Sequence, residues 1–209
     1  MIVDPRIEQY IDSLLPERHA VLLEMEARAQ DENIPIVGPA VGGLLALLAR
    51  LTAARRIFEL GSAIGYSTLW MALAGGPDCE VHYSDASAQR AAEAQAYFRK
   101  AGVANRIRIH VGDALSALRG AQGEFDLIFN DVDKEGYLTA LQEVPPRLRV
   151  GGVFVTDNTL WHGKVLEPHD EASETVVEFN RKLFLDNRFI TSLVPLRDGV
   201  SISLKLPTC

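Results

Sequence analysis

The sequence predicts an α/β fold, in which helices cover both faces of a doubly wound, mostly parallel β-sheet. From about residue 55 onward, short apolar runs of strand length alternate with segments of helical periodicity, as is typical of parallel strands joined by crossover helices. A glycine turn follows the first run, and 209 residues that are 47% apolar can bury a sizeable core. We therefore expect a single domain over residues 1–209, with N-terminal helices in 1–52 and the core in 53–209.

The N-terminal segment is expected to be helical. Asp4 followed by Pro5 fits an N-cap and a first helical turn, and Pro16 followed by Glu17 is interpreted as the start of a second helix. A third, leucine-rich helix is expected over residues 40–51.

Strands and helices then alternate to the C-terminus. The expected strands lie at 56–60, 80–84, 106–111, 125–130 and 153–156, and the expected helices at 66–74, 87–101, from 113 onward, 134–148 and near 171–186. Two further β segments, 189–195 and 200–206, flank Asp198-Gly199. Because Asp-Gly is a strong turn former, these last two segments should form an antiparallel hairpin.

Charge and cysteine content narrow the functional classes. The net charge of -7 disfavours nucleic acid or an anionic membrane as a partner, because a polyanion would be repelled overall. The two cysteines, Cys79 and Cys209, form no disulfide framework and no zinc-binding spacing. The most apolar stretch, residues 36–49, is too short to cross a bilayer, and the N-terminus does not resemble a secretory signal. We therefore expect a cytoplasmic protein.

The turn after the first expected strand has the form E-x-G-x-x-x-G, formed by Glu59, Gly61, Ser62 and Gly65. It lies where a buried strand gives way to a helix, which is where open α/β sheets bind nucleotides. Asp85 follows Gly65 by twenty residues, at the end of the second strand, where a carboxylate can accept hydrogen bonds from ribose hydroxyls. This pattern indicates a ligand with an adenosine moiety.

The spacing distinguishes between adenosine ligands. A dinucleotide site is expected to read G-x-G-x-x-G, and the carboxylate of Glu59 would repel a pyrophosphate but suits a ligand that carries an ammonium and a sulfonium group. Asp113, in Gly112-Asp113-Ala114 after the third strand, could accept a hydrogen bond from an adenine amino group. An aspartate there is also a common helix N-cap.

Polar side chains follow the fourth and fifth expected strands. Asp131 comes directly after residues 125–130, and Asp157 and Asn158 follow residues 153–156. If these strands are neighbours, two carboxylates and one amide oxygen converge. Such hard oxygen ligands favour Mg²⁺, or another divalent cation such as Mn²⁺ or Ca²⁺, and leave positions open for a substrate.

Lys134 follows Asp131 by three residues, close enough to reach a hydroxyl held at such a site. A nearby cation lowers the pKa both of a lysine and of a coordinated phenol, so Lys134 is a candidate general base. Each of these residues also has an ordinary structural role open to it, as a turn former, a helix cap or a solvated charge.

Taken together, these motifs resemble the cation-dependent O-methyltransferases, the family that includes the caffeoyl-CoA and catechol O-methyltransferases. The resemblance covers nearly the whole chain. The segments that carry it are 58–61, 65–69, Asp85, 112–114, 125–129, 131–134, 157–158, 160–161 and 198–199. The family has a Rossmann-like, seven-stranded sheet.

The resemblance also implies roles for particular residues. The cation would be held by Asp131, Asp157 and Asn158, with Lys134 as the base and Asp131 also close to the methyl donor. S-adenosylmethionine would be held by Val37, Glu59, Gly61, Ser67, Asp85 and Ala114. Trp161 could form an aromatic wall of the acceptor pocket, or simply pack its loop. The expected reaction moves the methyl group onto a hydroxyl of a small catechol-like acceptor, a hydroxylated aromatic molecule.

Other functions remain open from the sequence. A nicotinamide-dependent oxidoreductase would use the same sheet but lacks its glycine spacing here. A non-catalytic module that binds S-adenosylmethionine would leave Asp131, Asp157, Asn158 and Lys134 without a task, and a nucleic-acid methyltransferase is disfavoured by the acidic charge. The identity of the acceptor cannot be read from the sequence. Relatives are often dimers, so a homodimer is expected.

Overall fold

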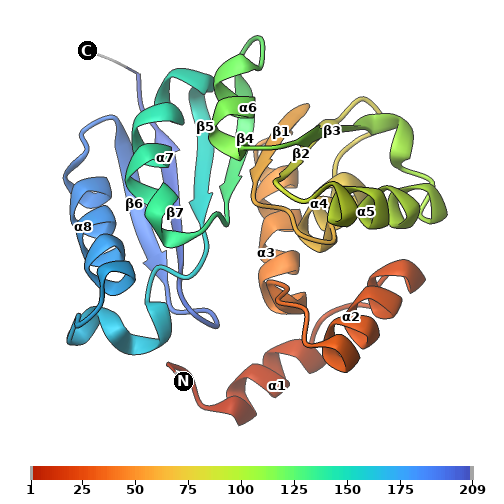
Figure 1. The fold of residues 1–209 in the computed structure, drawn as a ribbon, viewed down its shortest axis with the longest axis horizontal. Helices are drawn as coiled ribbons and strands as arrows, with labels where there is room; N and C mark the ends of the chain where they lie inside the picture. The colour runs from red at the N-terminus through yellow and green to blue at the C-terminus, as the bar shows by residue number, and fades with distance from the viewer. Residues whose placement is uncertain (1, 208–209) are drawn as a thin grey trace.

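The computed structural model describes residues 2–207, which leaves Cys209 outside the described residues. Seven strands form one sheet in the order β3-β2-β1-β4-β5-β7-β6, which runs from right to left in Figure 1. The strands are β1 (Arg56–Leu60), β2 (Glu80–Asp85), β3 (Ile107–Val111), β4 (Phe125–Asn130), β5 (Leu148–Thr156), β6 (Phe189–Val194) and β7 (Val200–Lys205). Strands β1 to β5 pair in parallel, whereas β6 and β7 form the antiparallel hairpin that the sequence predicts. The predicted fold class is confirmed.

Helices surround this sheet. They are α1 (Pro5–Ser13), α2 (Ala20–Glu32), α3 (Gly38–Leu51), α4 (Tyr66–Ala74), α5 (Ala88–Lys100), α6 (Ala114–Gly120), α7 (Tyr137–Glu143) and α8 (Glu171–Leu185). Four short 3₁₀ segments, η1 (Ala104–Arg106), η2 (Lys134–Gly136), η3 (Pro145–Arg147) and η4 (Trp161–Leu166), lie in the connections. None of the helices among residues 2–207 is long and apolar enough to cross a membrane.

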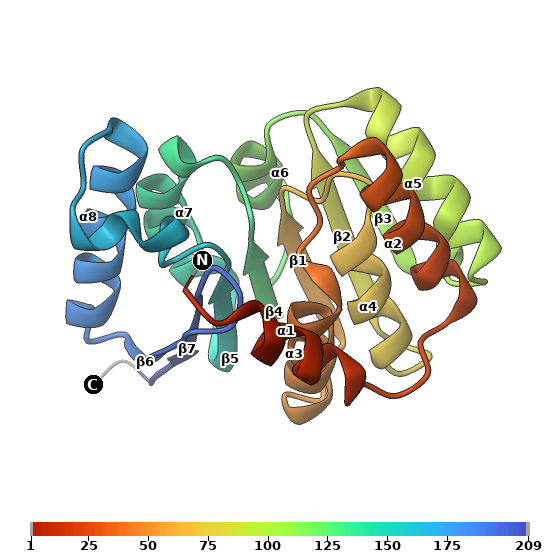
Figure 2. The ribbon, with the colours of Figure 1, turned by 90° about the horizontal axis from the view of Figure 1, so that it is seen from below.

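The core has two halves, one on each face of the sheet. One buried cluster joins the sheet to α2, α3, α4 and α5, and the other joins it to α6, α7 and α8. Figure 2 shows α1 lying across one end of the sheet, and Figure 1 shows the same helix beyond that end. Parallel strands that are covered on both faces are rich in apolar residues, and the apolar residues of β1 and β4 are buried on both faces of the sheet.

The expected start of the second helix at Pro16 and Glu17 is wrong. Helix α2 begins at Ala20, and the side chain of His19 caps it by accepting a hydrogen bond of 3.2 Å from the backbone N–H of Val21. Proline is common in a first helical turn, but here a histidine takes the N-cap position further along. The first helix does begin as expected, because Asp4 accepts from the N–H of Arg6 at 2.9 Å.

The expected helix over residues 134–148 is also wrong in its extent. It is divided into η2, α7 and η3, and the long strand β5 already begins at Leu148. Pro145 and Pro146 cannot donate to a helical ladder, so α7 ends at Glu143. Smaller differences are the start of α3 at Gly38 rather than 40 and the start of β3 at Ile107 rather than 106.

The register of the central strands positions the ends that carry polar residues. Leu60 pairs with Asn130, and Asn130 pairs with Thr156, so β1, β4 and β5 end side by side. The next residues continue this alignment, because Asp157 donates its N–H to the carbonyl of Asn130 at 3.1 Å. The residues after these three strands therefore emerge at one edge of the sheet.

Candidate active site

A cleft of about 1340 Å³ opens at this edge of the sheet. Its walls come from the ends of β1 to β5, the segment before α3, η4 and the turn between β6 and β7. Most residues that the sequence singles out line it: Val37, Gly61, Asp85, Asp113, Ala114, Asp131, Lys134, Asp157, Asn158 and Trp161. The expected cofactor and cation residues therefore share one cavity.

Glycine is required at two positions of the turn, for a different structural reason at each. Gly61 has a φ of 80°, and a Cβ atom there would lie 2.5 Å from the carbonyl oxygen of Asp131, so only glycine lets β1 approach the end of β4. Gly65 has a φ of 83°, and a Cβ atom there would meet the ring of Phe98 on α5. The second glycine therefore serves helix packing at the start of α4.

Four expected cofactor residues do not line the cleft: Glu59 in β1, Ser62 and Gly65 within the turn, and Ser67 in the first turn of α4. Glu59 is completely buried and accepts hydrogen bonds from the hydroxyls of Ser67 and Thr68 in the first turn of α4. A carboxylate is favoured near a helix N-terminus. Burial nevertheless raises the pKa of Glu59 to about 7, against the lowering effect of these hydrogen bonds.

Asp85 holds the backbone around the cofactor end of the cleft. It accepts from the N–H of Ala63 at 2.9 Å and from the N–H of Ser87 at 2.8 Å. Asp113 accepts from the N–H of Ser116 at 2.7 Å and thereby caps α6, and hydrogen bonding from the side chain and backbone of Ser116 holds the pKa of the Asp113 carboxyl below its usual range. Asp113 is thus a helix cap that also faces the cleft.

Asp131 and Asp157 lie at neighbouring strand ends, and within residues 2–207 neither carboxylate forms an ion pair, although the charge of Lys134 acts to lower the pKa of both. Removal from water raises the pKa of Asp131 well above its usual value, and repulsion by Asp157 raises it further. Burial raises the pKa of Asp157 to about 6. Oδ1 of Asp157 is buried without a hydrogen-bond partner among residues 2–207. Two adjacent buried carboxylates are electrostatically unfavourable unless a cation compensates their charge.

Asn158 and Lys134 complete this end of the cleft. Nζ of Lys134 donates to Oδ1 of Asn158 at 2.8 Å and to the hydroxyl of Tyr137 at 2.7 Å, and Tyr137 donates to the carbonyl of Asp157 at 2.7 Å. Lys134 is only 7% exposed, and burial lowers the pKa of its ammonium group, against the nearby carboxylates. The ammonium group of Lys134 therefore releases its proton at a lower pH than that of a surface lysine.

The segment after Asn158 is held in an unusual backbone conformation. Asn158, Trp161 and His162 have positive φ values of 52°, 44° and 56°. Asp198 fixes this segment by accepting from the N–H of His162. The ring of Trp161 lies 4.8 Å from Nζ of Lys134 and lines the cleft. Strained backbone conformations of this kind cluster at functional sites.

Sequence reasoning missed three residues of the site. Tyr137 follows Lys134 at helical i,i+3 spacing, and that signal could have identified it. The sequence indicates Asp198 only as a turn former and as part of the family resemblance, and it gives no signal for Arg197, although both line the cleft. No group of three His, Cys, Asp or Glu side chains within residues 2–207 could hold a metal ion; the expected ligand set has two carboxylates and an amide.

Comparisons with known proteins agree with this architecture. The family model described as O-methyltransferase matches residues 13–206. The chain is 34% identical to the catechol O-methyltransferase of Mycobacterium tuberculosis over 80% of this chain and 78% of that protein. It is 32% identical to caffeoyl-CoA O-methyltransferase 1 of Eucalyptus globulus, over 91% and 82% respectively. The O-methyltransferase TomG of Streptomyces achromogenes, solved in complex with S-adenosylmethionine, superposes with a TM-score of 0.87 at 30% identity and covers 97% of this chain and 96% of that one.

The sheet and the cleft at its carboxyl edge define a Rossmann-like methyltransferase. The chain belongs to the O-methyltransferase family of the caffeoyl-CoA and catechol type, and it is an S-adenosylmethionine-dependent enzyme. Of the functions left open by the sequence, methyl transfer is therefore the one that holds.

Proposed function

We propose that this enzyme methylates one hydroxyl of a small aromatic acceptor with two adjacent hydroxyl groups, and that it requires a divalent cation held by Asp131, Asp157 and Asn158. The relatives named for catechol and caffeoyl-CoA support this acceptor class. The single observation that carries the cation proposal is the buried, unpartnered Oδ1 of Asp157 next to a second raised-pKa carboxyl on the adjacent strand.

The donor set fits a hard divalent ion. Two carboxylates and one amide oxygen leave open positions, as Mg²⁺ sites in enzymes do, and Mn²⁺ or Ca²⁺ has the same ligand preference. When bound, such an ion would hold both acceptor oxygens and lower the pKa of the reacting hydroxyl. S-adenosylmethionine would supply a methyl group that is already activated by its sulfonium.

Lys134 would take the proton of the reacting hydroxyl. Its Nζ atom is fixed by Asn158 and Tyr137, and its pKa is lowered by burial, which favours the neutral amine that a base requires. Nζ of Lys134 would hold that proton while the acceptor oxygen takes the methyl group from the sulfonium, which would leave S-adenosylhomocysteine. The remaining contribution of the protein is orientation of the two reactants, which has a ceiling of roughly 7–11 kcal/mol.

Two groups of residues would hold the methyl donor. Gly61, Asp85, Asp113, Ala114 and Val37 line the cleft and would contact it directly, with Asp131 between donor and cation. Ser62 and Gly65 would shape the turn itself, and Glu59 and Ser67, which are hydrogen-bonded to each other, would support it from beneath. Trp161 would form the aromatic wall beside the acceptor.

The test is a methyl-transfer screen on aromatic acceptors with adjacent hydroxyls and on matched acceptors with one isolated hydroxyl, each with Mg²⁺ and with EDTA. We expect product only from the adjacent hydroxyls, and none with EDTA. The same screen with Asp157→Ala should give no product. Turnover that survives both EDTA and Asp157→Ala would contradict the proposed cation dependence.

We also propose that the chain works as one domain and as a homodimer. Helices α2 and α3 share a buried cluster with the sheet, which makes these two N-terminal helices part of the same core. Ile7, Tyr10 and Leu14 in and after α1, and Leu47 and Leu51 on α3, are large apolar side chains that are more than half exposed. Light scattering should give twice the chain mass, and Leu51→Glu with Leu14→Glu should give the monomer mass.

A further inference from the structure

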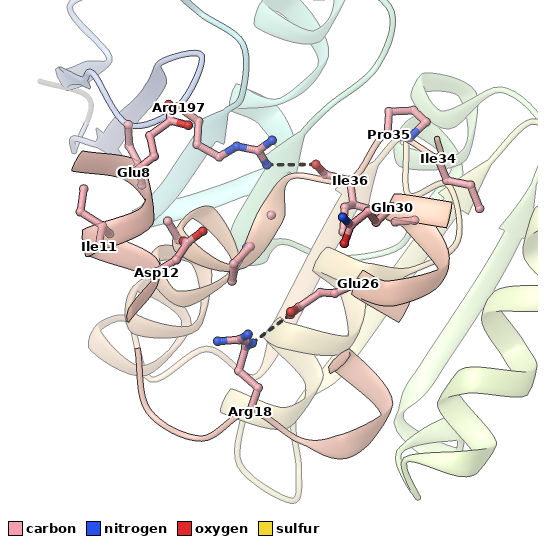
Figure 3. Close-up of a pocket in the computed structure, with 15 residues that line it drawn as sticks. Glu8, Ile11, Asp12, Arg18, Glu26, Gln30, Ile34, Pro35, Ile36 and Arg197 are labelled. Carbon is pink, nitrogen blue, oxygen red and sulfur yellow. Dashed lines mark hydrogen bonds and ion pairs between the residues drawn. The ribbon is translucent and has the colours of Figure 1, made fainter. Parts of the chain in front are cut away.

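A second cavity, of about 530 Å³, adjoins the cleft (Figure 3). It lies between α1, α2, the segment before α3 and the turn between β6 and β7. Glu8, Pro35, Ile36 and Arg197 line both cavities. An acceptor that extends from the cleft past these residues would therefore reach the second cavity.

Arg197 stands at the boundary of the two cavities in a constrained conformation. Its backbone has a φ of 49°, in the left-handed region, immediately before the Asp198-Gly199 turn. Its Nη1 donates to the carbonyl oxygen of Ile36 at 3.0 Å, the contact drawn in Figure 3. A Cβ atom at Gly38 would collide with the guanidinium, so this glycine makes room for it. The side chain is thus held in place from two directions.

The guanidinium of Arg197 has hydrogen-bond donors that are free to bind a ligand. Ile36 is its only hydrogen-bond acceptor among residues 2–207, and no carboxylate in that part of the chain lies within ion-pair distance of it. Arginine presents its donors as a planar fork that matches a carboxylate. The charge of Arg197 acts to lower the pKa of Asp12 and of Asp157 without an ion pair to either, so a ligand carboxylate at this boundary would meet an oriented guanidinium with free donors.

The rest of the second cavity is acidic. Glu8, Asp12 and Glu26 line it against Arg18 and Arg197, so three carboxylates face two guanidinium groups. Glu26 is already paired, with Arg18 at 3.0 Å and with the hydroxyl of Tyr66 at 2.7 Å. Glu8 and Asp12 have no hydrogen-bond or ion-pair partner for their side chains in the described chain. A chain of phosphates that passed Arg197 would run against these carboxylates.

We propose that Arg197 selects acceptors that carry one carboxylate beyond the dihydroxy ring, and that the acidic second cavity disfavours polyanionic acceptors such as CoA thioesters. The inference rests on the proposed function, because it assumes that the ring is bound at Asp131, Asp157 and Asn158. It names the substrate class of this chain as compact aromatic acids, in contrast to the CoA thioester in the name of one relative.

The experiment compares three acceptors that share the same ring: 3,4-dihydroxycinnamate, its methyl ester and its CoA thioester. Values of kcat and KM are measured with S-adenosylmethionine and Mg²⁺ for the wild type, Arg197→Gln and Arg197→Lys. Arg181→Gln is the matched control, because Arg181 is an exposed arginine of α8 outside both cavities and the charge change is the same. A double variant, Glu8→Gln with Asp12→Asn, tests the acidic lining.

We expect the wild type to prefer the free acid over the methyl ester by about 10–100-fold in kcat/KM, the range for a hydrogen bond between charged groups. Arg197→Gln should remove most of this ratio, mainly through the KM for the acid, and Arg197→Lys should keep part of it. Arg181→Gln should keep the wild-type ratio. The CoA thioester should have the lowest kcat/KM of the three acceptors. The double variant should raise the kcat/KM for the thioester relative to that for the ester.

Two results would overturn the inference. One is a wild type that prefers the thioester or the ester, and the other is a preference for the acid that persists in Arg197→Gln. Both leave methyl transfer to the ring intact. Failure of the proposed function is told apart by the acceptor screen described above, in which no aromatic acceptor with adjacent hydroxyls would then be methylated.

Discussion

Nζ of Lys134 lies 2.8 Å from Oδ1 of Asn158, which joins the proposed base directly to a proposed cation ligand. The same nitrogen donates to Tyr137, whose hydroxyl holds the backbone carbonyl of Asp157. The base and the ligands of the following strand end are therefore positioned by one hydrogen-bond network. A change at any member should affect the others.

Replacement of Lys134 tests its role as the base. Lys134→Ala should lower kcat by about 10²–10⁴-fold, the usual contribution of a positioned acid or base. Lys134→Arg should fail similarly, because arginine keeps its proton. Initial rates of methyl transfer measure this, and calorimetric binding of S-adenosylhomocysteine should change little in both variants. Lys182→Ala, at an exposed lysine of α8, is the control. Near-normal kcat in Lys134→Ala would rule out the assignment.

Tyr137 is expected to act through Lys134 rather than on the acceptor. Tyr137→Phe removes the hydroxyl between Nζ of Lys134 and the carbonyl of Asp157, and it leaves that buried carbonyl unpaired. The cost in the free energy of unfolding should be about 1–3 kcal/mol. The pH at which kcat rises should also shift, because Lys134 loses a partner. Denaturant unfolding and a pH–rate profile measure the two effects; an unchanged profile would make Tyr137 purely structural.

Glu59 should make the stability of the free protein depend on pH. Its pKa is about 7 in the folded chain against 4.5 as the ordinary value, so between these pH values the folded state holds a proton that the unfolded state has released. Stability from this group is therefore greatest below pH 4.5 and falls as pH rises to about 7, by about 3 kcal/mol. Glu59→Gln lacks this loss. The difference in unfolding free energy between the two proteins should therefore change across this pH range. A difference that stays constant would show that Glu59 ionises normally.

Asn130 should be replaceable by an apolar residue with a gain in stability. It is completely buried at the end of β4, and neither polar atom of its side chain has a partner among residues 2–207. Asn130→Leu removes two unsatisfied polar groups and keeps the branched arrangement of side-chain heavy atoms. It should raise the free energy of unfolding by less than the about 1–3 kcal/mol cost of the unsatisfied groups, because the methyl groups of leucine are bulkier than the amide. Calorimetric melting provides the measurement. A lower melting temperature would indicate that the amide binds an internal water.

The fold was largely predictable because its signals are local. The apolar runs at β1 and β4, the glycine turn and Asp198-Gly199 each specify one element, and the alternation of elements specifies a parallel sheet. The extent of α7 was not predicted, since the helical pattern around Pro145 outweighed the missing donors of the two prolines. The start of α2 was missed because His19 is an uncommon cap.

The site was predictable where residues follow strands and unpredictable where it depends on distant packing. Asp131 and Asp157 were identified because parallel strands end at one edge, and the pairing of Asn130 with Thr156 brings their successors together. The position of Glu59 beneath the turn depends on hydrogen bonds to α4, and Arg197 reaches Ile36 across 161 positions of sequence. Such contacts leave no periodic pattern in the chain.

The most direct test of the central claim is a calorimetric titration of Mn²⁺ into the metal-free protein with S-adenosylhomocysteine bound. The wild type should bind one ion per chain, and Asp131→Asn, Asp157→Asn and Asn158→Ala should each weaken binding by more than about tenfold, since even indirect changes around a metal cost 10–100-fold. Equal affinity in all four proteins, or no binding to the wild type, would contradict a shared cation at these three residues.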